Sequence, residues 1–226
     1  ASGCDSTVTL NLTINNSNTG TDVQTACDSY TWIDGITYNS SNNTSTHILT
    51  NASGCDSTVT LNLTIFSSPV VDAGSNQTIN CIDNVNGVSI GSSSQSGIVY
   101  QWSPSDGLSN INSSNPIANP LETTQYTLTT TNSFGCSSTD EVLVEVNTEY
   151  PTANAGTGGI ITCIENINGI TIGSPTITGL NYQWQPSLGL SQPNESTTNA
   201  FPVASTYYQL QVTNPINGCT TTDSVF

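Results

Sequence analysis

The sequence contains no lysine and no arginine in 226 residues, although ordinary usage would supply about 25 of them. Against 16 Asp and Glu residues the chain has a single histidine as its only basic side chain, so it can form neither phosphate clamps nor ordinary salt bridges. This absence argues against nucleic acid, anionic membranes and polyphosphates as partners. What remains is a surface rich in Ser, Thr and Asn with a weak negative field, which resists self-association.

Residues that support catalysis are equally scarce. His47 is the only histidine, and we interpret it as an ordinary strand residue. No GxSxG, HExxH, Walker or Rossmann pattern occurs. Asp140, Glu141 and Glu145 are interpreted as residues of a solvated strand face. We therefore expect no enzymatic activity.

Long apolar runs are also missing. The sequence has no initiator Met, no charged leader and no apolar run near the length of a membrane span. We therefore expect neither a signal peptide nor a membrane span here, and an anchor elsewhere in a longer protein.

Metal ligation has little support in the sequence. No CxxC motif occurs, and one histidine cannot complete a zinc site. Calcium is the one metal to consider, because Asp72 and Glu149 lie near the start and end of one expected domain and could meet an ion at a junction. Asx turns and solvated edges are the alternative interpretation of these carboxylates. We expect no cofactor, with calcium as the only candidate.

Two kinds of internal repeat organise the chain. The segment ASGCDSTVTLNLTI occupies residues 1–14 and recurs, letter for letter, at residues 52–65. A longer segment, PVVDAGSNQTINCIDNVNGVSIGS from Pro69, matches PTANAGTGGIITCIENINGITIGS from Pro151. We predict the end of an upstream repeat (1–14), a short first repeat (15–65), a second repeat (66–148) and a third repeat (149–226) that is truncated at its last strand.

Seven cysteines without a CxxC motif indicate structural disulfides formed in an oxidising compartment. Alignment of the repeats suggests that each first cysteine pairs with the second cysteine of the same repeat. Loops of roughly 29 and 56 residues would contribute about 3.6 and 4.2 kcal/mol in the chain-entropy model, which matters for small units with few large apolar residues. The expected bonds are Cys27–Cys55, Cys81–Cys136 and Cys163–Cys219, with Cys4 unpaired in this sequence.

Apolar and polar residues alternate strictly in several segments. Val59, Leu61, Leu63 and Ile65 alternate with Thr and Asn, which is the pattern of a half-buried strand. No segment sustains the apolar period of a helix. The predicted fold class is all-β. Further strands are expected at Val8–Ile14, Tyr126–Leu128, Val142–Val146 and Tyr208–Val212.

Asp-Gly and Asn-Gly pairs mark the expected turns. Asp34-Gly35 stands between two β-rich arms and predicts a two-residue type I′ hairpin. Asn86-Gly87 and Asn168-Gly169 predict the same turn in the longer repeats.

The second and third repeats share one order of cysteine and tryptophan. In each, a cysteine is followed by a tryptophan and then by a second cysteine, which resembles the disulfide-and-tryptophan core of an immunoglobulin-like sandwich. We expect two sheets with the disulfide and the tryptophan packed between them. Short connections containing proline predict that these sandwiches and the small disulfide-stapled unit form an extended rod. The residues in question are Cys81, Trp102 and Cys136, and Cys163, Trp184 and Cys219.

The repeats resemble those of very large cell-surface adhesins of gliding Bacteroidota. The likeness lies in CDSYTWIDGITYNSS with GCDSTVTLNLTI, and in YQWSP with TTQYTLTTTN and TDEVLVEV. It implies secretion by the type IX system and a filament at the cell surface that is attached to the outer membrane. It also implies contact with motility machinery through regions outside this sequence, and O-glycosylation of Asp-Ser-x tripeptides at Ser6, Ser57 and Ser224.

The first functional hypothesis is an adhesive stalk whose partners are neighbouring repeats of the chain and an extracellular surface or polysaccharide. The second is a carbohydrate-binding module in which Trp32, Tyr30 and Tyr38 form an exposed stacking platform. Solvent exposure of Trp32 separates these two hypotheses. A third is an accessory domain of a secreted hydrolase, which requires a catalytic domain elsewhere.

Overall fold

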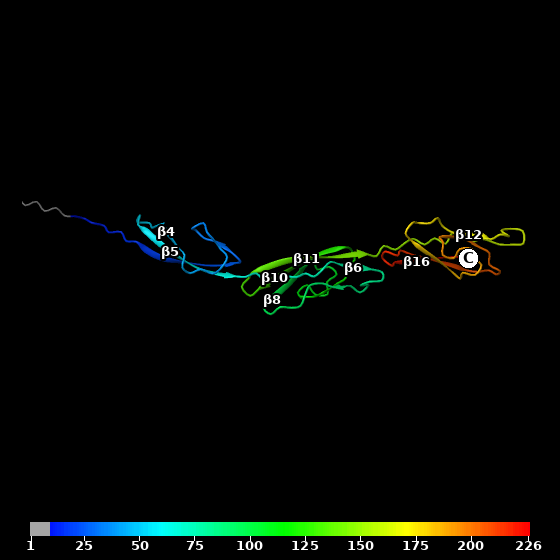
Figure 1. Ribbon diagram of the computed structural model, residues 1–226, viewed down its shortest axis with the longest axis horizontal. Helices are drawn as coiled ribbons and strands as arrows, with labels where there is room; N and C mark the ends of the chain where they lie inside the picture. The colour runs from blue at the N-terminus through cyan, green and yellow to red at the C-terminus, as the bar shows by residue number, and fades with distance from the viewer. Residues whose placement is uncertain (1–9) are drawn as a thin grey trace, which may run out of the picture. The chain divides into compact units, whose positions relative to one another are not determined.

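The chain forms strands and no helices in the part that the structure describes. The computed structural model describes residues 10–226, which contain sixteen β-strands, and the predicted all-β fold is confirmed (Figure 1). In these residues no helix has the length and hydrophobicity needed to cross a membrane.

The first repeat contains a three-stranded sheet with β5 in its centre. β5 pairs in parallel with β1 and antiparallel with β4, which lies beside it in Figure 1. Leu61 and Leu63 are buried while Asn62 and Thr64 are exposed, so the predicted alternation is confirmed. The strands are β1 (Asn18–Cys27), β2 (Tyr30–Thr31), β3 (Thr37–Tyr38), β4 (Thr46–Thr50) and β5 (Asp56–Phe66).

The Asp34-Gly35 hairpin is present with a different turn. β2 pairs with β3, and the Trp32 amide donates a hydrogen bond to the Ile36 carbonyl at 3.1 Å. A type I′ turn needs two residues with positive φ, and here Gly35 has a φ of 80° while Asp34 has no positive φ. The turn is therefore not of type I′, and the prediction was wrong in that detail.

The strand predicted at Val8–Ile14 is not found where it can be assessed. Residues 8 and 9 lie outside the described residues. Leu10, Leu12 and Ile14 lie in a segment without strand and are 80, 67 and 71% exposed. No described strand pairs with this segment, and an alternating sequence without a partner strand cannot bury its apolar face.

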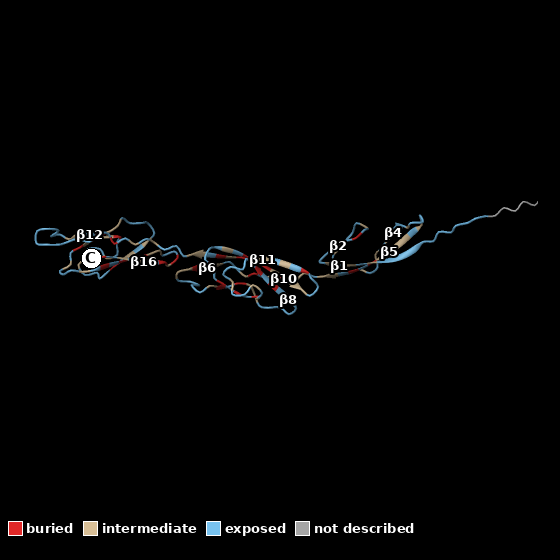
Figure 2. Ribbon diagram, turned by 180° about the vertical axis from the view of Figure 1, so that it is seen from behind, coloured by how far each residue is buried: buried red, intermediate tan, exposed pale blue. Residues whose placement is uncertain are grey.

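The second repeat is built on a four-stranded sheet in the order β6-β11-β10-β8, with β7 and β9 paired separately. β6 runs parallel to β11. Trp102, Tyr126, Leu128 and Val144 are buried, and Figure 2 shows buried residues along β8, β10 and β11. The strands are β6 (Gln77–Asn80), β7 (Val88–Ser89), β8 (Ile98–Ser103), β9 (Ile117–Ala118), β10 (Thr124–Asn132) and β11 (Ser137–Asn147).

The third repeat has the same plan with one strand fewer. Its sheets are β12-β14 and β13-β15-β16, and its core contains Trp184, Leu210 and Val212. Residues 159–162, which correspond to β6, form no strand. The strands are β12 (Ile170–Gly173), β13 (Asn181–Gln185), β14 (Thr197–Ala200), β15 (Tyr208–Thr213) and β16 (Thr220–Val225).

The Asn-Gly pairs of the longer repeats do not form the predicted hairpins. β6 and β7 flank Asn86-Gly87, but β6 pairs with β11 and β7 pairs with β9. The segment before Asn168-Gly169 forms no strand, and β12 pairs with β14. The turn at Asn86-Gly87 therefore connects strands of two different sheets, and the turn at Asn168-Gly169 precedes a strand that pairs with β14.

The described chain divides into two compact units. One comprises residues up to Val70 with 97–99 and 130–138, and the other comprises 71–96, 100–129 and 139–226. The tip of the β10–β11 hairpin belongs to the first unit, and Cys136 in that tip is bonded to Cys27.

Gly91 should not tolerate a side chain. Its φ is +80°, and a Cβ there would lie 2.1 Å from the Ser114 carbonyl oxygen. We expect Gly91→Ala to lower the free energy of unfolding by about 2 to 4 kcal/mol, measured by urea titration. The matched control is Gly97→Ala, which has a φ of +75° and open space around it, and should cost about 1 kcal/mol. Equal losses in the two variants would contradict the steric account.

Candidate functional site: the repeat junctions

The disulfides join successive repeats. Cys27 is bonded to Cys136 and Cys81 to Cys219, with Cα atoms 5.5 and 4.9 Å apart. The predicted bonds Cys27–Cys55, Cys81–Cys136 and Cys163–Cys219 were therefore wrong in their pairing. Cys55 and Cys163 are free thiols, the first half-buried and the second exposed, and Cys4 lies outside the described residues.

Strand direction explains why a cysteine cannot pair within its own repeat. β1 runs parallel to β5, which places Cys27 beside Phe66 at the end of β5, whereas Cys55 immediately precedes that strand. The eleven residues of β5 separate the two positions by about 36 Å. A disulfide needs Cα atoms within about 7 Å. In the second repeat β11 separates Cys136 from Cys81 in the same way.

We call Cys27, Cys81 and Cys163 the loop cysteines, and Cys55, Cys136 and Cys219 the turn cysteines. Each bond therefore joins the loop cysteine of one repeat to the turn cysteine of the next. The expectation that a disulfide packs beside Trp102 or Trp184 between two sheets is also wrong. Both indoles are buried without one, and their Nε1–H groups donate to the carbonyls of Ser113 and Glu195.

Each turn cysteine lies at the tip of a hairpin that an asparagine side chain organises. In the β10–β11 hairpin, Asn132 Oδ1 accepts hydrogen bonds from the amides of Phe134 and Cys136, both at 3.0 Å. The Gly135 amide donates to the Asn132 carbonyl at 3.1 Å. The β15–β16 hairpin is one residue longer, and there Asn217 Oδ1 accepts the amide of Cys219 at 3.0 Å.

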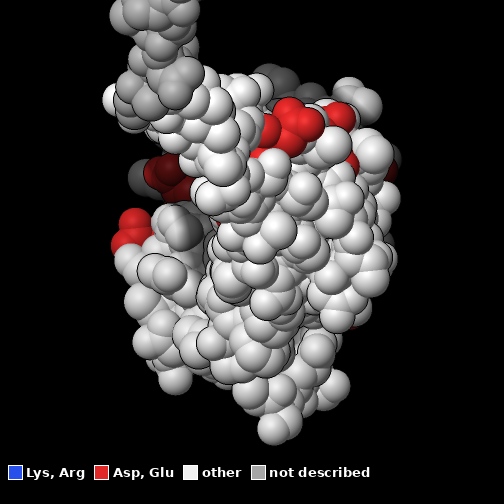
Figure 3. Space-filling model, turned by 90° about the vertical axis from the view of Figure 1, so that its left-hand side faces the viewer, with Lys and Arg blue, Asp and Glu red and all other residues white. Residues whose placement is uncertain are grey.

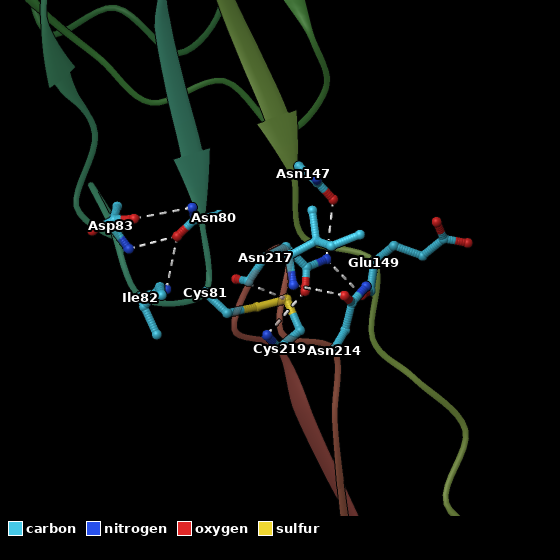
Figure 4. The surroundings of a disulfide bond; sticks show 10 residues. Asn80, Cys81, Ile82, Asp83, Asn147, Glu149, Asn214, Asn217 and Cys219 are labelled. Atoms are coloured by element: carbon cyan, nitrogen blue, oxygen red, sulfur yellow. Dashed lines mark hydrogen bonds between the residues drawn. A yellow bond between two sulfur atoms is a disulfide. The ribbon is translucent and has the colours of Figure 1, made fainter. Parts of the chain in front are cut away.

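The same turns also hold the linker that enters their repeat. Asn132 Nδ2 donates to the Ser67 carbonyl at 2.9 Å. Asn217 Nδ2 donates to the Glu149 carbonyl at 2.9 Å and to Asn147 Oδ1 at 3.0 Å. Figure 4 shows Asn217 between Asn147 and Glu149, beside the disulfide. Asn217 is fully buried, so these hydrogen bonds are protected from water.

Both bonds have further polar and apolar contacts beside them. The rings of Phe66 and Phe134 stack at 3.9 Å next to Cys136, whose sulfur contacts the Phe66 carbonyl. At the other bond, the Cys81 amide donates to the Asn217 carbonyl at 3.0 Å. Ile82 packs so closely on Gly218 that a Cβ there would lie 2.6 Å from the isoleucine side chain.

Few titratable groups are perturbed near these junctions. Hydrogen bonds from the Ser68 hydroxyl and amide lower the pKa of Asp28, which follows Cys27. The ionised Asp28 carboxylate therefore stabilises the linker at pH values above its ordinary pKa. This stabilisation is lost as the pH falls through the lowered pKa. Burial raises the pKa of Tyr126 and of Tyr208 in the cores.

The calcium candidates are not brought into a shared site. Asp72 Oδ1 accepts the Gly74 amide at 2.9 Å, which is an Asx turn. The Glu149 carboxylate points away from Asn217 in Figure 4. Within residues 10–226, no group of three or more His, Cys, Asp or Glu side chains could hold a metal ion.

The candidate glycosylation residues differ in exposure. Ser224 is exposed on β16, opposite Gln209. Ser57 is half-buried in β5, between β1 and β4. Ser6 lies outside the described residues.

Trp32 does not form an exposed platform. Its side chain is 3% exposed and packs with Leu61 and Leu63. Its Nε1–H donates to Asp22 at 2.8 Å, and His47 meets the indole edge-on. The carbohydrate platform predicted from Trp32, Tyr30 and Tyr38 is therefore excluded in this form, because its central ring is part of the core.

A cavity of about 400 Å³ in the third repeat lies beside β16 and is lined by Ile161, Ile172 and Phe226 among others. Ile161 corresponds to Ile79 of β6. In the second repeat β6 pairs with the end of β11, where Val144 is fully buried. Counterparts of the β6 residues thus line this cavity without forming a strand, and its lining contains no Asp, Glu, His or Cys.

The charged side chains of the chain are all acidic apart from the single histidine. On the face drawn in Figure 3, acidic side chains form small separate groups among uncharged residues, and no basic side chain is present. Two carboxylates have structural roles that the sequence did not reveal. Asp140 accepts the amide of Ala73, and Asp223 accepts the amide of Ala155, both at 2.8 Å.

No known protein family and no curated protein matches this chain. Among solved structures, it is similar to protocadherin gamma C5 EC1-3, with 12% identity, 81% of this chain and 77% of that chain covered, and a TM-score of 0.38. The human desmocollin-1 ectodomain matches with 12% identity over 77% of this chain and a TM-score of 0.33, and the chain spans 39% of that ectodomain. A PKD domain solved in solution matches with 26% identity and a TM-score of 0.30, and the match covers 38% of this chain and 94% of that domain. At TM-scores this low, these likenesses say nothing about what this chain binds.

Proposed function

We propose that this chain is a series of structural repeats from an adhesive filament at the cell surface, in which each repeat is covalently locked to the next. The observation that carries the proposal is that both disulfides connect successive repeats. A bond inside a repeat limits the extension of that repeat alone, whereas a bond between neighbours limits how far the series can extend under load. The proposal includes no catalytic role.

The mechanical consequence follows from the path of covalent bonds. With Cys81 bonded to Cys219, a pulling force passes across the bond and bypasses the 138-residue separation between them. Unfolding of the bypassed residues then adds no length to the filament. Hydrogen bonds and packing hold each junction in place, while the disulfide limits its extension.

Single-molecule force spectroscopy tests this role. Reduction is expected to add the 138 residues between Cys81 and Cys219 to the extensible chain, about 470 Å at roughly 3.4 Å per residue. The matched variant carries Cys27→Ser and Cys136→Ser together, and it should show the same gain. A gain of about 190 Å in that variant, the length of one within-repeat loop, would contradict the proposal.

The resemblance to gliding Bacteroidota adhesins supports the finer part of the proposal. We place the filament outside the cell, attached to the outer membrane after type IX secretion, and in contact with a surface or polysaccharide. Its attachment to motility machinery requires other regions. The polar, weakly acidic surface suits an extracellular filament, because like charges limit aggregation.

Antibodies raised against this chain test the location. They should label intact source cells, and beads coated with them should be carried along gliding cells. Labelling that appears only after permeabilisation would contradict a surface position. Mass in excess of the polypeptide at Ser57 or Ser224 in the native protein would support O-glycosylation, whereas bare hydroxyls at both residues would contradict it.

A further inference from the structure

The loop around Cys163 has the same hydrogen bonds as the loop around Cys81. The Asn80 amide donates to the Asp83 carbonyl at 3.0 Å, and the Thr162 amide donates to the Glu165 carbonyl at 2.9 Å. Asn80 Oδ1 accepts hydrogen bonds from the amides of Ile82 and Asp83. Thr162 Oγ1 accepts them from the amides two and three residues after it, those of Ile164 and Glu165. The two loops are therefore built alike although their first residues differ.

A left-handed asparagine closes both loops in the same way. Asn84 has a φ of 57° and Asn166 a φ of 54°. Their side-chain amides donate to the carbonyls of Thr78 and Ile160, at 2.8 and 2.7 Å. Cys163 is thus held in a loop that has already formed, and it differs from Cys81 in that no partner is bonded to it.

The loop around Cys81, which we call the occupied loop, shows which contacts a partner would make with the loop around Cys163, which we call the free loop. Cys81 is bonded to Cys219, and Ile82 packs on Gly218 of the same hairpin turn. In the free loop, Ile164 corresponds to Ile82 and is 89% exposed, against 66% for Ile82. Cys163 and Ile164 are therefore both exposed, and they correspond to the two residues, Cys81 and Ile82, that contact the hairpin turn in the other loop.

The turn around Cys55 is the complementary half. Asn51 Oδ1 accepts the amides of Ser53 and Cys55 at 3.0 Å, as Asn132 does for Phe134 and Cys136. Asn51 Nδ2 also donates to the Asn16 carbonyl of the entering linker at 3.1 Å. The Cys55 turn thus has the internal bonds and the linker contact of the bonded turns, and it lacks only a loop cysteine.

We propose that the Cys163 loop is a docking site for the Asn- and Gly-containing hairpin turn of a further repeat, and that the Cys55 turn docks the loop of another. The bond forms when two thiols lose two protons and two electrons to a small disulfide such as oxidised glutathione, which leaves as two thiols. This inference rests on the structural part of the proposed function, and it can fail while the existing junctions still carry load.

Extension of the chain tests the docking site directly. Phe226 corresponds to Leu143, so a second copy of residues 144–226 is added after Phe226 and the product is folded in a glutathione buffer. We expect Cys163 to become protected from alkylation, and peptide mapping to find it bonded to the added copy of Cys219. Full alkylation of Cys163, with the two added cysteines bonded to each other, would overturn the proposal.

A second assay needs no new folded segment and distinguishes the source of the partner. Two chains, both with Cys4→Ser, carry either Cys55→Ser or Cys163→Ser, and they are mixed in the same buffer. A heterodimer linked by a disulfide between Cys163 and Cys55 would show that a separate chain can dock. If no heterodimer forms, but Cys163 of the extended chain is bonded to the added copy of Cys219, the partner is a repeat of the same polypeptide. Absence of the bond in both assays overturns the proposal.

Discussion

Replacement of Cys81 and Cys219 together by serine is expected to lower the free energy of unfolding by about 4 to 5 kcal/mol. The bond spans 138 residues, and in the chain-entropy model so large a loop restricts the unfolded chain strongly. Denaturant unfolding, followed by tryptophan fluorescence, measures the change. Both cysteines are replaced so that no unpaired thiol remains to exchange with the other bond.

The control for this loss is the double variant Cys55→Ser and Cys163→Ser. These residues are free thiols, so their removal should change the free energy of unfolding by less than about 0.5 kcal/mol. Equal effects of the two double variants would show that Cys81 and Cys219 contribute as thiols and not as a bond.

Trp184→Ala is expected to destabilise the third repeat by about 3 to 5 kcal/mol. The side chain is 1% exposed and belongs to a core with Leu210 and Val212, so truncation leaves a large void. The Glu195 carbonyl also loses the hydrogen bond that the Trp184 indole donates to it at 2.9 Å. Urea titration measures the loss, and the fluorescence of the remaining tryptophans reports the other two repeats.

Val203→Ala is the matched control for this core substitution. Val203 lies in the same repeat and is fully exposed, so its truncation should stay within about 0.5 kcal/mol of the unsubstituted chain. A similar loss for Val203→Ala and Trp184→Ala would mean that Trp184 does not pack as the structure describes.

Local periodicity predicted the strands well where a partner strand exists. The alternation around Leu61 and Leu63 correctly gave β5, because a sheet with one buried face imposes a period of two on its sequence. The same alternation at Val8–Ile14 predicted a strand, and its described residues, 10–14, form none. Alternation of apolar and polar residues shows which face of a strand would be buried. Whether the strand forms depends on a partner strand that can lie far away in the sequence.

The junctions could not be predicted from the spacing of the cysteines. The decisive fact is that β1 lies parallel to β5, which puts Cys27 and Cys55 at opposite ends of one strand. Parallel pairing is a long-range property that no local pattern states. One signal was available, since Asn and Gly precede each turn cysteine at nearly constant spacing, as in Asn51 to Cys55 and Asn132 to Cys136, which is the pattern of a hairpin tip.

Cleavage in the linker that enters the third repeat tests the central claim most directly. The chain has no Lys or Arg, so Thr152→Arg, at an exposed linker position, creates a single trypsin site. After digestion, residues 1–152 and 153–226 should migrate together on a non-reducing gel and separate after reduction, because Cys81 is bonded to Cys219. Separation of the two fragments without reductant would contradict the covalent locking of successive repeats.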